Sequence, residues 1–502
     1  MQSIQVYVRK IKVQGSTVFS EDEFEEITAP YTDRYVATED LEQLRIALTK
    51  QYQSKGFINS GAVIPDQEVE NATIRIQIIE GELSRIMISK DPWFRDGYLK
   101  ARIRDSVSKP LNIHDLQKGL QILQQNEAIR QIRAELKPGV EPGQSVLEME
   151  VFEKKPYELA ARIDNYQSPS VGGEQGQVRL ASGNLSGWGD RLSLTYGRSE
   201  GLDPMVDAWY AFPLTADELT ATARYRRNDF SVIEAPFEDL DVESESESIS
   251  GSLRLPVMRD LNQELALSLE LEYQENETFL LGEPFSFSPG AEDGQSSVTA
   301  LRFRQDWTRR TTREVIALSS RFSFGLDLFG ATVHSDRPDG RFLAWLGQAQ
   351  WARILGHTDI QTLARLDIQL ANESLLPLEQ IAVGGRYSVR GYRENELVRD
   401  NGLSASLEVR IPLVQDAVFA DSLYLAPFID YGRGWNEDLP TPSPKDLYSI
   451  GAGFIWDWTP FSKFPELETR FEVYWGYPLK DVDTNDGDLQ DDGIHFLFSV
   501  NY

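Results

Sequence analysis

Cysteine is absent from the 502-residue sequence, and histidine occurs only four times. Without cysteine, neither a disulfide nor a thiolate metal site can form. The histidines, at positions 114, 334, 357 and 495, are too dispersed for metal-ligand spacing, so we expect no metal site and no cofactor. A cysteine-free chain suits an envelope protein that crosses the periplasm unfolded, although many other chains also lack cysteine.

Long apolar runs and excess positive charge are also missing. No window approaches 18 consecutive apolar residues, so we expect no helical membrane span. A membrane-spanning β-strand needs only about 10 residues with alternating faces, which a hydropathy search overlooks. The formal charge of −29 argues against nucleic-acid binding and indicates an acidic surface. Residues 1–4 show no signal peptide, so an exported form would be a processed or trimmed chain.

Patterns of known catalytic sites are absent as well. The sequence contains neither a phosphate-binding Gly-x-x-x-x-Gly-Lys-Ser/Thr loop nor a His-Glu-x-x-His motif, and we predict no catalysis. The acidic stretch 481–487 superficially suggests a calcium loop. Its glycine stands one position too late for an EF-hand and no ligand glutamate follows, which favours a solvated acidic loop.

One pattern occurs twice in the first 155 residues. Its first copy predicts a strand at 7–13, a helix that opens with a capping box of Ser20 and Glu23, a long helix, and two final strands. The long helix covers 38–55 and the two strands 61–69 and 72–80. The second copy predicts a strand at 83–89, helices at 98–107 and 113–126, and strands at 132–136 and 145–153. A β-α-α-β-β unit that recurs after about 75 residues is an internal repeat.

Helical periodicity ends at Pro156, where strand-like runs begin. Runs such as 265–273 and 403–411 place apolar residues two positions apart, with serine, threonine, arginine, glutamate or glutamine between them. This alternation is typical of a transmembrane antiparallel barrel with a polar interior. It predicts about 16 strands, beginning near Tyr157. The 19 tyrosines, 24 phenylalanines and 10 tryptophans are compatible with aromatic girdles at the membrane interfaces.

The connections between these strands give an independent signal. Long and short connections alternate, as expected for extracellular loops and periplasmic turns. The long ones cover 229–244, 277–294, 327–340, 372–401 and 480–493, and the short ones 214–217, 309–313 and 355–358. The last ten residues alternate and end on an aromatic residue, like the insertion signal of outer-membrane proteins. Phe496, Phe498 and Tyr502 carry that signal, and His495 is expected to face the lumen.

The connection 372–401 is the most distinctive part of the sequence. Its glycines permit tight turns and close backbone approach, and they alternate with arginines and tyrosines. We predict that this loop folds into the barrel, because long unstructured connections are usually functional or disordered and its apolar content argues against disorder. Asp430 has the parity of a lumen-facing residue and could accept a bidentate guanidinium contact from Arg390. The pair would pin the loop inside the barrel.

The N-terminal repeat resembles the polypeptide-transport-associated (POTRA) domain. The resemblance rests on Tyr-Gln-Ser-Lys-Gly-Phe at 52–57, Glu-Gly-Glu at 80–82 and Lys-Pro-Leu-Asn at 109–112. It implies non-enzymatic modules that bind extended chains by adding a strand to a sheet edge. Two ordinary α+β modules without a partner are the alternative.

Two further motifs resemble the superfamily of POTRA-bearing barrels, which includes the BamA insertases and the TpsB transporters. They are Val-Arg-Gly-Tyr at 389–392 and Phe-x-Asp-x-Gly at 428–432, and residues 184–189 are similar to the first periplasmic turn of that family. The resemblance implies that Arg390 contacts Asp430. The supporting positions would be Val389, Gly391, Tyr392, Phe428 and Gly432.

Two POTRA modules favour the TpsB branch, similar to FhaC and the haemolysin secretion transporters. The resemblance implies two-partner secretion of a large β-helical exoprotein by a protein of the outer membrane of a Gram-negative-type bacterium. Its POTRA domains would lie in the periplasm, and its barrel would contact outer-membrane lipid after insertion by the barrel-assembly machinery. An insertase for other barrels is the alternative, followed by a passive diffusion pore.

The expected fold is thus two α+β POTRA domains followed by a membrane β-barrel. The expected boundaries are 1–81 for POTRA domain 1, 82–155 for POTRA domain 2, and 156–502 for the barrel with its inward loop 372–401. TpsB transporters commonly begin with a helix that plugs the pore, whereas this sequence begins almost at the first POTRA strand. The contribution of a plug is therefore left open.

Overall fold

The computed structural model describes residues 5–459, 467–482 and 487–502. The chain forms two compact units, which we describe one at a time. Unit 1 contains residues Met1–Pro156 together with Ser186–Gly189, and unit 2 contains the rest. The predicted domain boundaries stay predictions.

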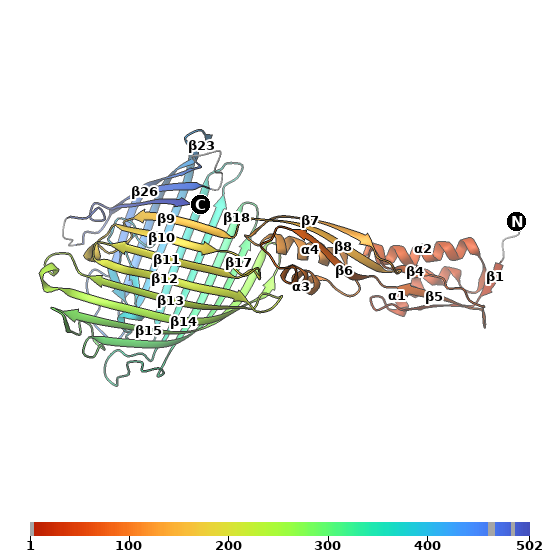
Figure 1. The fold of residues 1–502 in the computed structure, drawn as a ribbon, viewed down its shortest axis with the longest axis horizontal. Helices are drawn as coiled ribbons and strands as arrows, with labels where there is room; N and C mark the ends of the chain where they lie inside the picture. The colour runs from red at the N-terminus through yellow and green to blue at the C-terminus, as the bar shows by residue number, and fades with distance from the viewer. Residues whose placement is uncertain (1–4, 460–466, 483–486) are drawn as a thin grey trace. The chain divides into compact units, whose positions relative to one another are not determined.

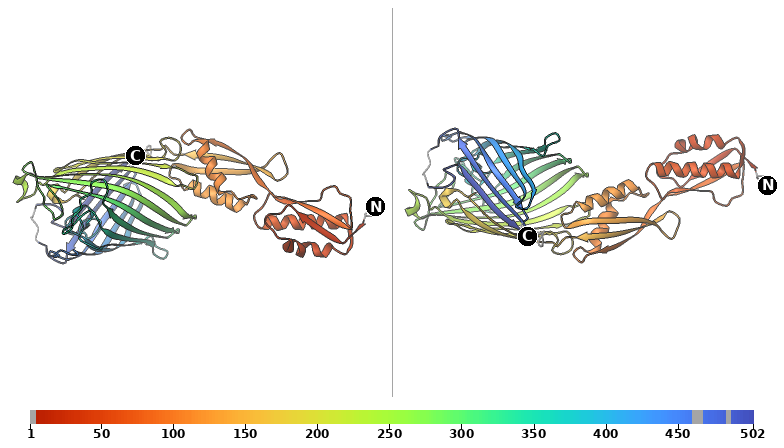
Figure 2. Two further views of the ribbon diagram at one scale, coloured as in Figure 1. Left: turned by 90° about the horizontal axis from the view of Figure 1, so that it is seen from below. Right: turned by 90° about the horizontal axis from the view of Figure 1, so that it is seen from above.

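The first module of unit 1 contains a three-stranded sheet, a two-stranded ribbon and two α-helices (Figure 1). The helices pack on one face of the strands (Figure 2), over a core that includes Leu44, Leu48, Tyr52 and Ile76. The sheet has the order β2-β5-β4, and the ribbon pairs β1 with β3. The elements are β1 (Gln5–Val8), β2 (Lys10–Gln14), α1 (Glu21–Thr28), β3 (Arg34–Ala37), α2 (Thr38–Ser54), β4 (Gly61–Val63) and β5 (Thr73–Ile79).

Two predicted strands of this module were wrong in extent. The strand at 7–13 is two strands, because the chain breaks at Arg9 and both Arg9 N and Lys10 N donate to the carbonyl of Ala72 (2.7 and 3.2 Å). The strand predicted at 61–69 ends at Val63. Beyond Val63, the backbone no longer pairs with β5. The Gln67 side chain bonds the β5 backbone instead, accepting from Arg75 N (2.8 Å) and donating to Arg75 O (2.7 Å). The ribbon strand β3 was not predicted.

The second module follows the predicted order. It consists of β6 (Glu82–Lys90), α3 (Asp96–Ser106), α4 (Ile113–Gln124), β7 (Ile129–Pro138) and β8 (Gln144–Glu153), with β8 central in a β6-β8-β7 sheet. The two modules meet at Gly81, whose carbonyl accepts from Leu111 N (2.7 Å). A Cβ on Gly81 would lie 2.1 Å from Oδ1 of Asn59, so a side chain at the junction would displace the Asn59 carboxamide.

Unit 2 is a closed antiparallel barrel of sixteen strands within the described residues, as predicted. A two-residue strand, β16 (Glu283–Pro284), adds to the end of β15, and the last barrel strand pairs with the first. No helix of the described chain is both long and apolar enough to cross a membrane. The barrel strands are β9 (Tyr157–Asp164), β10 (Gln175–Ser182), β11 (Arg191–Ser199), β12 (Leu202–Pro213), β13 (Thr220–Ser231), β14 (Val242–Arg259), β15 (Gln263–Leu280), β17 (Gln295–Arg310), β18 (Glu314–Leu326), β19 (Leu343–Ile354), β20 (Gln361–Ala371), β23 (Asn401–Ala417), β24 (Ala420–Trp435), β25 (Asp446–Trp458), β26 (Glu468–Pro478) and β27 (Ile494–Asn501).

Barrel strands present apolar residues outward and polar residues inward. On β15, Leu269 and Leu271 are exposed on the outer face, whereas Glu272 is buried toward the lumen. On the outer face, Tyr273 of β15 lies opposite Ile249 of β14. The next outward-facing pair along these two strands is Glu275 and Glu247, so the apolar band of β15 ends at Tyr273. The outer surface of the β14–β15 pair therefore changes from apolar to acidic within two residues.

The connections alternate in length as predicted, with one exception. Only Glu200 and Gly201 connect β11 to β12 at the end of the barrel that carries the long loops. The predicted loop 229–244 is shorter than expected, because the β13–β14 ladder continues to Ser231 opposite Glu243. Of the acidic stretch 481–487, residues 483–486 lie outside the described residues.

Candidate functional site

The connection between β20 and β23 folds into the lumen. It forms a short 3-10 helix, η4 (Pro377–Glu379), and a hairpin of β21 (Ile381–Val383) and β22 (Leu397–Arg399). Val389 and Leu397 are fully buried, and with Val383 and Tyr392 they pack against Leu447 of β25. A loop that buries its own apolar residues against the wall has a defined position in the barrel.

Glycines allow the loop backbone to touch the wall. Gly391 has φ of +91°, and a Cβ on it would lie 2.7 Å from the carbonyl carbon of Gly476 in β26. A Cβ on Gly476 would in turn lie 2.7 Å from the carbonyl carbon of Arg390. A Cβ on Gly432 would collide with the Val383 and Val389 side chains, at 2.5 and 2.6 Å. Any side chain at these positions would push the loop off the wall.

Arg390 lies at the centre of this contact and is 3% exposed. Its Nε and Nη2 donate to the two carboxylate oxygens of Asp430, each at 2.8 Å, and its backbone N–H donates to Oδ2 of the same residue at 3.0 Å. Asp430 is 2% exposed and projects inward from β24. The contact has the bidentate geometry in which a guanidinium holds a carboxylate most specifically.

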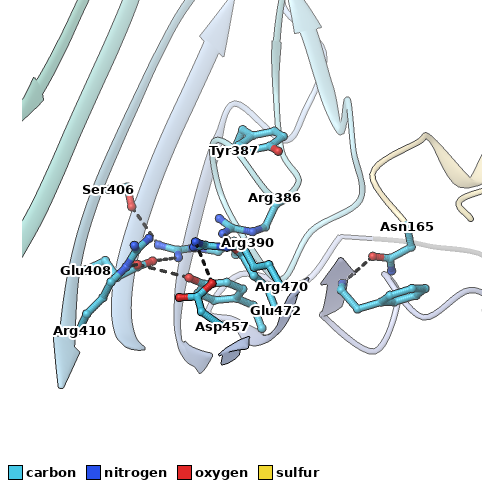
Figure 3. Close-up of polar contacts among 12 residues, drawn as sticks. Asn165, Arg386, Tyr387, Arg390, Ser406, Glu408, Arg410, Asp457, Arg470 and Glu472 are labelled. Carbon is cyan, nitrogen blue, oxygen red and sulfur yellow. Dashed lines mark hydrogen bonds and ion pairs between the residues drawn. The ribbon is translucent and has the colours of Figure 1, made fainter. Parts of the chain in front are cut away.

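The Arg390 guanidinium has further partners on the wall (Figure 3). Nη1 pairs with the Glu408 carboxylate and Nη2 donates to Ser406 Oγ at 2.9 Å, both on β23. Its flat face lies over the Phe428 ring, with 3.6 Å from Cζ to the ring centroid. Arg410 Nε donates to the far oxygen of Glu408 at 2.8 Å, so two arginines and two carboxylates balance in charge.

A second layer surrounds this cluster. Arg386 of the loop lies over the Tyr474 ring, 4.0 Å from its centroid, and donates to Glu472 at 2.8 Å. The Tyr392 hydroxyl lies 2.9 Å from the carbonyl oxygen of Tyr448 and accepts from its N–H at 3.2 Å. A cavity of about 320 Å³ borders both layers and lies between the loop and residues of β18, β19 and β20, where Arg365 of β20 still donates to the carbonyl of Tyr387 (2.8 Å). The loop therefore has open space beside it in the lumen.

The base of the loop has a separate anchor. Glu379 in η4 receives two hydrogen bonds from Arg302 of β17, at 3.0 Å from Nη1 and 2.7 Å from Nη2. Arg302 also donates through Nε to Glu272 of β15 (2.9 Å) and through Nη1 to Ser323 of β18 (2.8 Å). Both Arg302 and Glu379 are buried. Here the loop supplies the carboxylate and the wall supplies the guanidinium.

Sequence reasoning brought Arg390 and Asp430 together but missed several of their neighbours. Glu408, Arg302 and Glu379 were not singled out. The sequence signal available for Glu408 and Arg302 was their position on the inward-facing side of a strand. Many other lumenal residues share that position, so the signal does not single these two out. The predicted insertion residues Phe498 and Tyr502 are exposed, and Phe496 is half-buried.

The lumenal position expected for His495 is also observed. It is fully buried, and its Nε2 accepts from Gly391 N at 3.4 Å. Among residues 5–459, 467–482 and 487–502, no group of three or more histidine, cysteine, aspartate or glutamate residues is placed to hold a metal ion.

Comparison with known proteins identifies the family. The profile of the haemolysin secretion/activation proteins ShlB/FhaC/HecB matches residues 143–454, and that of the ShlB-type POTRA domain matches residues 6–81. The outer membrane transporter CdiB of Dickeya dadantii is 23% identical, over 89% of this chain and 79% of its own. The heme/hemopexin transporter protein HuxB of Haemophilus influenzae is 21% identical, over 86% of this chain and 77% of its own.

A solved structure shows the same fold. CdiB from Escherichia coli superposes with a TM-score of 0.72 at 21% identity, covering 100% of this chain and 91% of the other. The predicted resemblance to the TpsB transporters is confirmed, and with it the outer-membrane barrel and the periplasmic location of the POTRA modules. The chain belongs to the haemolysin secretion/activation family of POTRA-bearing outer-membrane transporters.

Proposed function

We propose that this transporter exports one large β-helical exoprotein, which its POTRA modules bind as an extended chain and which passes through the barrel once the inward loop has moved. The observation that carries this proposal is the mode of loop attachment. The barrel wall is a continuous backbone ladder, whereas the charged contacts that hold the loop to the wall are side-chain ion pairs such as those at Arg390 and Glu379. Ion pairs can exchange partners without breaking the barrel.

The second POTRA module offers edges for an extended chain. In the β6-β8-β7 sheet, β6 and β7 are the outer strands, and each has one side without a neighbouring strand among the described residues. A groove of about 460 Å³ lies on the sheet, lined by Met87, Met149 and charged residues that include Arg133 and Glu135. Met87 is half exposed. Strand addition to an edge with side-chain contacts in a neighbouring groove is a known mode of peptide recognition.

The proposal assigns no catalytic step to this chain. Export would draw its free energy from folding of the exoprotein outside the cell, which agrees with the absence of a nucleotide-binding motif from the sequence. The other proposed partners are outer-membrane lipid around the apolar band and the barrel-assembly machinery during biogenesis. Phe496, Phe498 and Tyr502 would carry the signal for that machinery.

The test is a secretion assay with a large secreted, repeat-rich protein taken from the neighbouring reading frame as the candidate exoprotein. Arg390→Ala and Asp430→Ala are expected to leave a folded, heat-modifiable barrel in the outer membrane and to reduce secretion at least tenfold. Arg399→Ala is the control, because this loop arginine donates to the carbonyl of Val398 (2.8 Å) rather than to a wall carboxylate. Unchanged secretion in both anchor variants would exclude a role of the pair in export.

Depletion of the transporter separates this function from that of an insertase. Loss of one secreted protein supports export, whereas a general loss of outer-membrane proteins supports an insertase. In planar bilayers we expect a small, fluctuating conductance. A permanently open channel that is unaffected by deletion of the POTRA modules would indicate a diffusion pore instead.

A further inference from the structure

The barrel closes along a short seam between β9 and β27. Residues 160–164 of β9 pair with residues 497–501 of β27, and Leu159 exchanges two further backbone hydrogen bonds of 2.8 Å with Tyr502. By comparison, β9 pairs with β10 along all of Tyr157–Asp164. The first residues of β27 therefore extend beyond the end of β9 on the side of the long loops.

The side chain of Asn165 continues the seam where the strand ladder stops. Its Nδ2 donates to the carbonyl of Ile494 at 2.8 Å. Its Oδ1 accepts from Phe496 N, also at 2.8 Å, and this is the contact drawn from Asn165 in Figure 3. Asn165 N also donates to Phe496 O at 3.3 Å. The carboxamide thus acts as an additional peptide group of β9. Asn165 is fully buried, so water cannot readily replace it.

Gln490 links this asparagine to the inward loop. Its Nε2 donates to the carbonyls of Asn165 (2.8 Å) and Gln167 (2.6 Å), whereas its Oε1 accepts from Glu394 N (2.8 Å). Gln490 is 1% exposed. Next to it, Arg393 of the loop donates through Nη2 to Asp491 at 2.8 Å. One buried side chain therefore bonds the seam with its donor end and the loop with its acceptor end.

We propose that Gln490 is a positioning residue that couples the inward loop to the β9–β27 seam, so that displacing the loop loosens the seam at the end of the long loops. When the loop withdraws, Gln490 loses its acceptor contact with Glu394 and its neighbour Asp491 loses Arg393. The amide is then free to leave Asn165 and Gln167. Since coupling between two sites is reciprocal, loosening the seam must also favour loop displacement.

Amide hydrogen exchange of the detergent-purified full chain tests the coupling. Arg390→Ala releases the loop without removing a contact of Gln490 or Asn165, although the neighbouring Gly391 N also donates to His495 of β27 (3.4 Å). We expect exchange at the Phe496 amide, which donates to Asn165, to become roughly tenfold faster, as expected for the loss of one buried hydrogen bond. Unchanged exchange at Phe496 in this variant overturns the proposal.

Gln490→Glu removes the hydrogen bonds of Gln490 to the seam and keeps its hydrogen bond to the loop. The new carboxylate still accepts from Glu394 N but has no N–H to donate to Asn165 and Gln167, and its size is unchanged. The variant is expected to accelerate Phe496 exchange by a similar factor. Gln177→Glu is the control. Gln177 of β10 donates to Gln175 at 2.9 Å and makes no hydrogen bond to the inward loop within the described residues.

A double-mutant cycle distinguishes coupling from simple support of the fold. If Gln490 only stabilises the seam, the effects of Arg390→Ala and Gln490→Glu on Phe496 exchange multiply. If it transmits the position of the loop, Arg390→Ala adds no further acceleration in the Gln490→Glu background. Multiplicative effects therefore overturn the proposal even when both single variants accelerate exchange.

Discussion

The two anchors of the inward loop use the same chemistry in opposite directions. At Arg390, the loop inserts a cation between the carboxylates of Glu408 and Asp430 on β23 and β24. At Glu379, the loop inserts an anion against Arg302 of β17. Both pairs are buried, so the wall must present the complementary charge at each point before the loop can settle there.

The anchors differ in what remains when the loop leaves. Withdrawal of Arg390 leaves two buried carboxylates. Within the described residues Glu408 keeps Arg410 and Tyr474, whereas Asp430 keeps no hydrogen-bond partner. Withdrawal of Glu379 leaves Arg302 still bonded to Glu272 and Ser323. The wall cluster at the tip of the loop therefore needs Arg390 to balance its charge. The wall cluster at the base remains paired when Glu379 leaves. The order in which the loop detaches should be base first and tip last.

Arg390→Ala is expected to have the largest effect on loop position. It removes the partner of Asp430 and exposes the Phe428 ring, so the closed loop should lose about 3 to 5 kcal/mol, as when one partner of a buried pair is deleted. Opening is measured by exchange at the Val389 and Tyr392 amides. The Arg399→Ala variant should behave as the wild type, and equal exchange in the two variants would contradict this assignment.

Asp430→Ala is expected to cost less than Arg390→Ala. Arg390 keeps Glu408 and Ser406 after the change, so only the bidentate contact and its backbone bond are lost. We expect the closed loop to lose about 1.5 to 3 kcal/mol, the range for hydrogen bonds to charged groups. The same amide exchange provides the measurement. An effect larger than that of Arg390→Ala would mean that Glu408 does not share the arginine.

Glu379→Ala is expected to be milder again. Since Arg302 retains Glu272, the change removes one carboxylate without leaving the guanidinium unpaired, and the loss should be about 1 to 2 kcal/mol. Exchange should increase at the base of the loop and much less at Val389. If both ends respond equally, the loop moves as one rigid body and the distinction between the anchors is wrong.

Sequence reasoning succeeded where a signal is local and failed where it depends on the path of the loop. Alternation along 403–411 predicts which residues of β23 face inward, because side chains of a strand alternate between its faces. The same alternation cannot say that Glu408, rather than another inward carboxylate, meets Arg390. That choice depends on barrel closure and on how far the loop descends, which strand patterns do not encode.

Contacts distant along the chain show the same limit. Arg302 and Glu379 are 77 positions apart, in a strand and a short helix that carry no common motif. By contrast, Arg390 and Asp430 belong to two short patterns with glycines at Gly391 and Gly432, whose need for close approach is visible in the residue type itself. Glycines therefore indicated the tip anchor, and nothing comparable indicated the base anchor.

Tyr392→Phe is expected to have the smallest effect and to report on the tip alone. The ring stays packed, because Tyr392 is 4% exposed, but its hydroxyl no longer bonds the backbone of Tyr448. The hydroxyl donates one of these bonds and accepts the other, and at the low end of the range for neutral groups their joint loss should cost about 1 kcal/mol. Exchange should rise at the Tyr448 amide and stay at the wild-type rate at Glu379. Equal acceleration at Tyr448 and Glu379 would show that the tip and the base open together. That result would contradict the predicted order, in which the base detaches first because Arg302 stays paired and the tip detaches last because Asp430 does not.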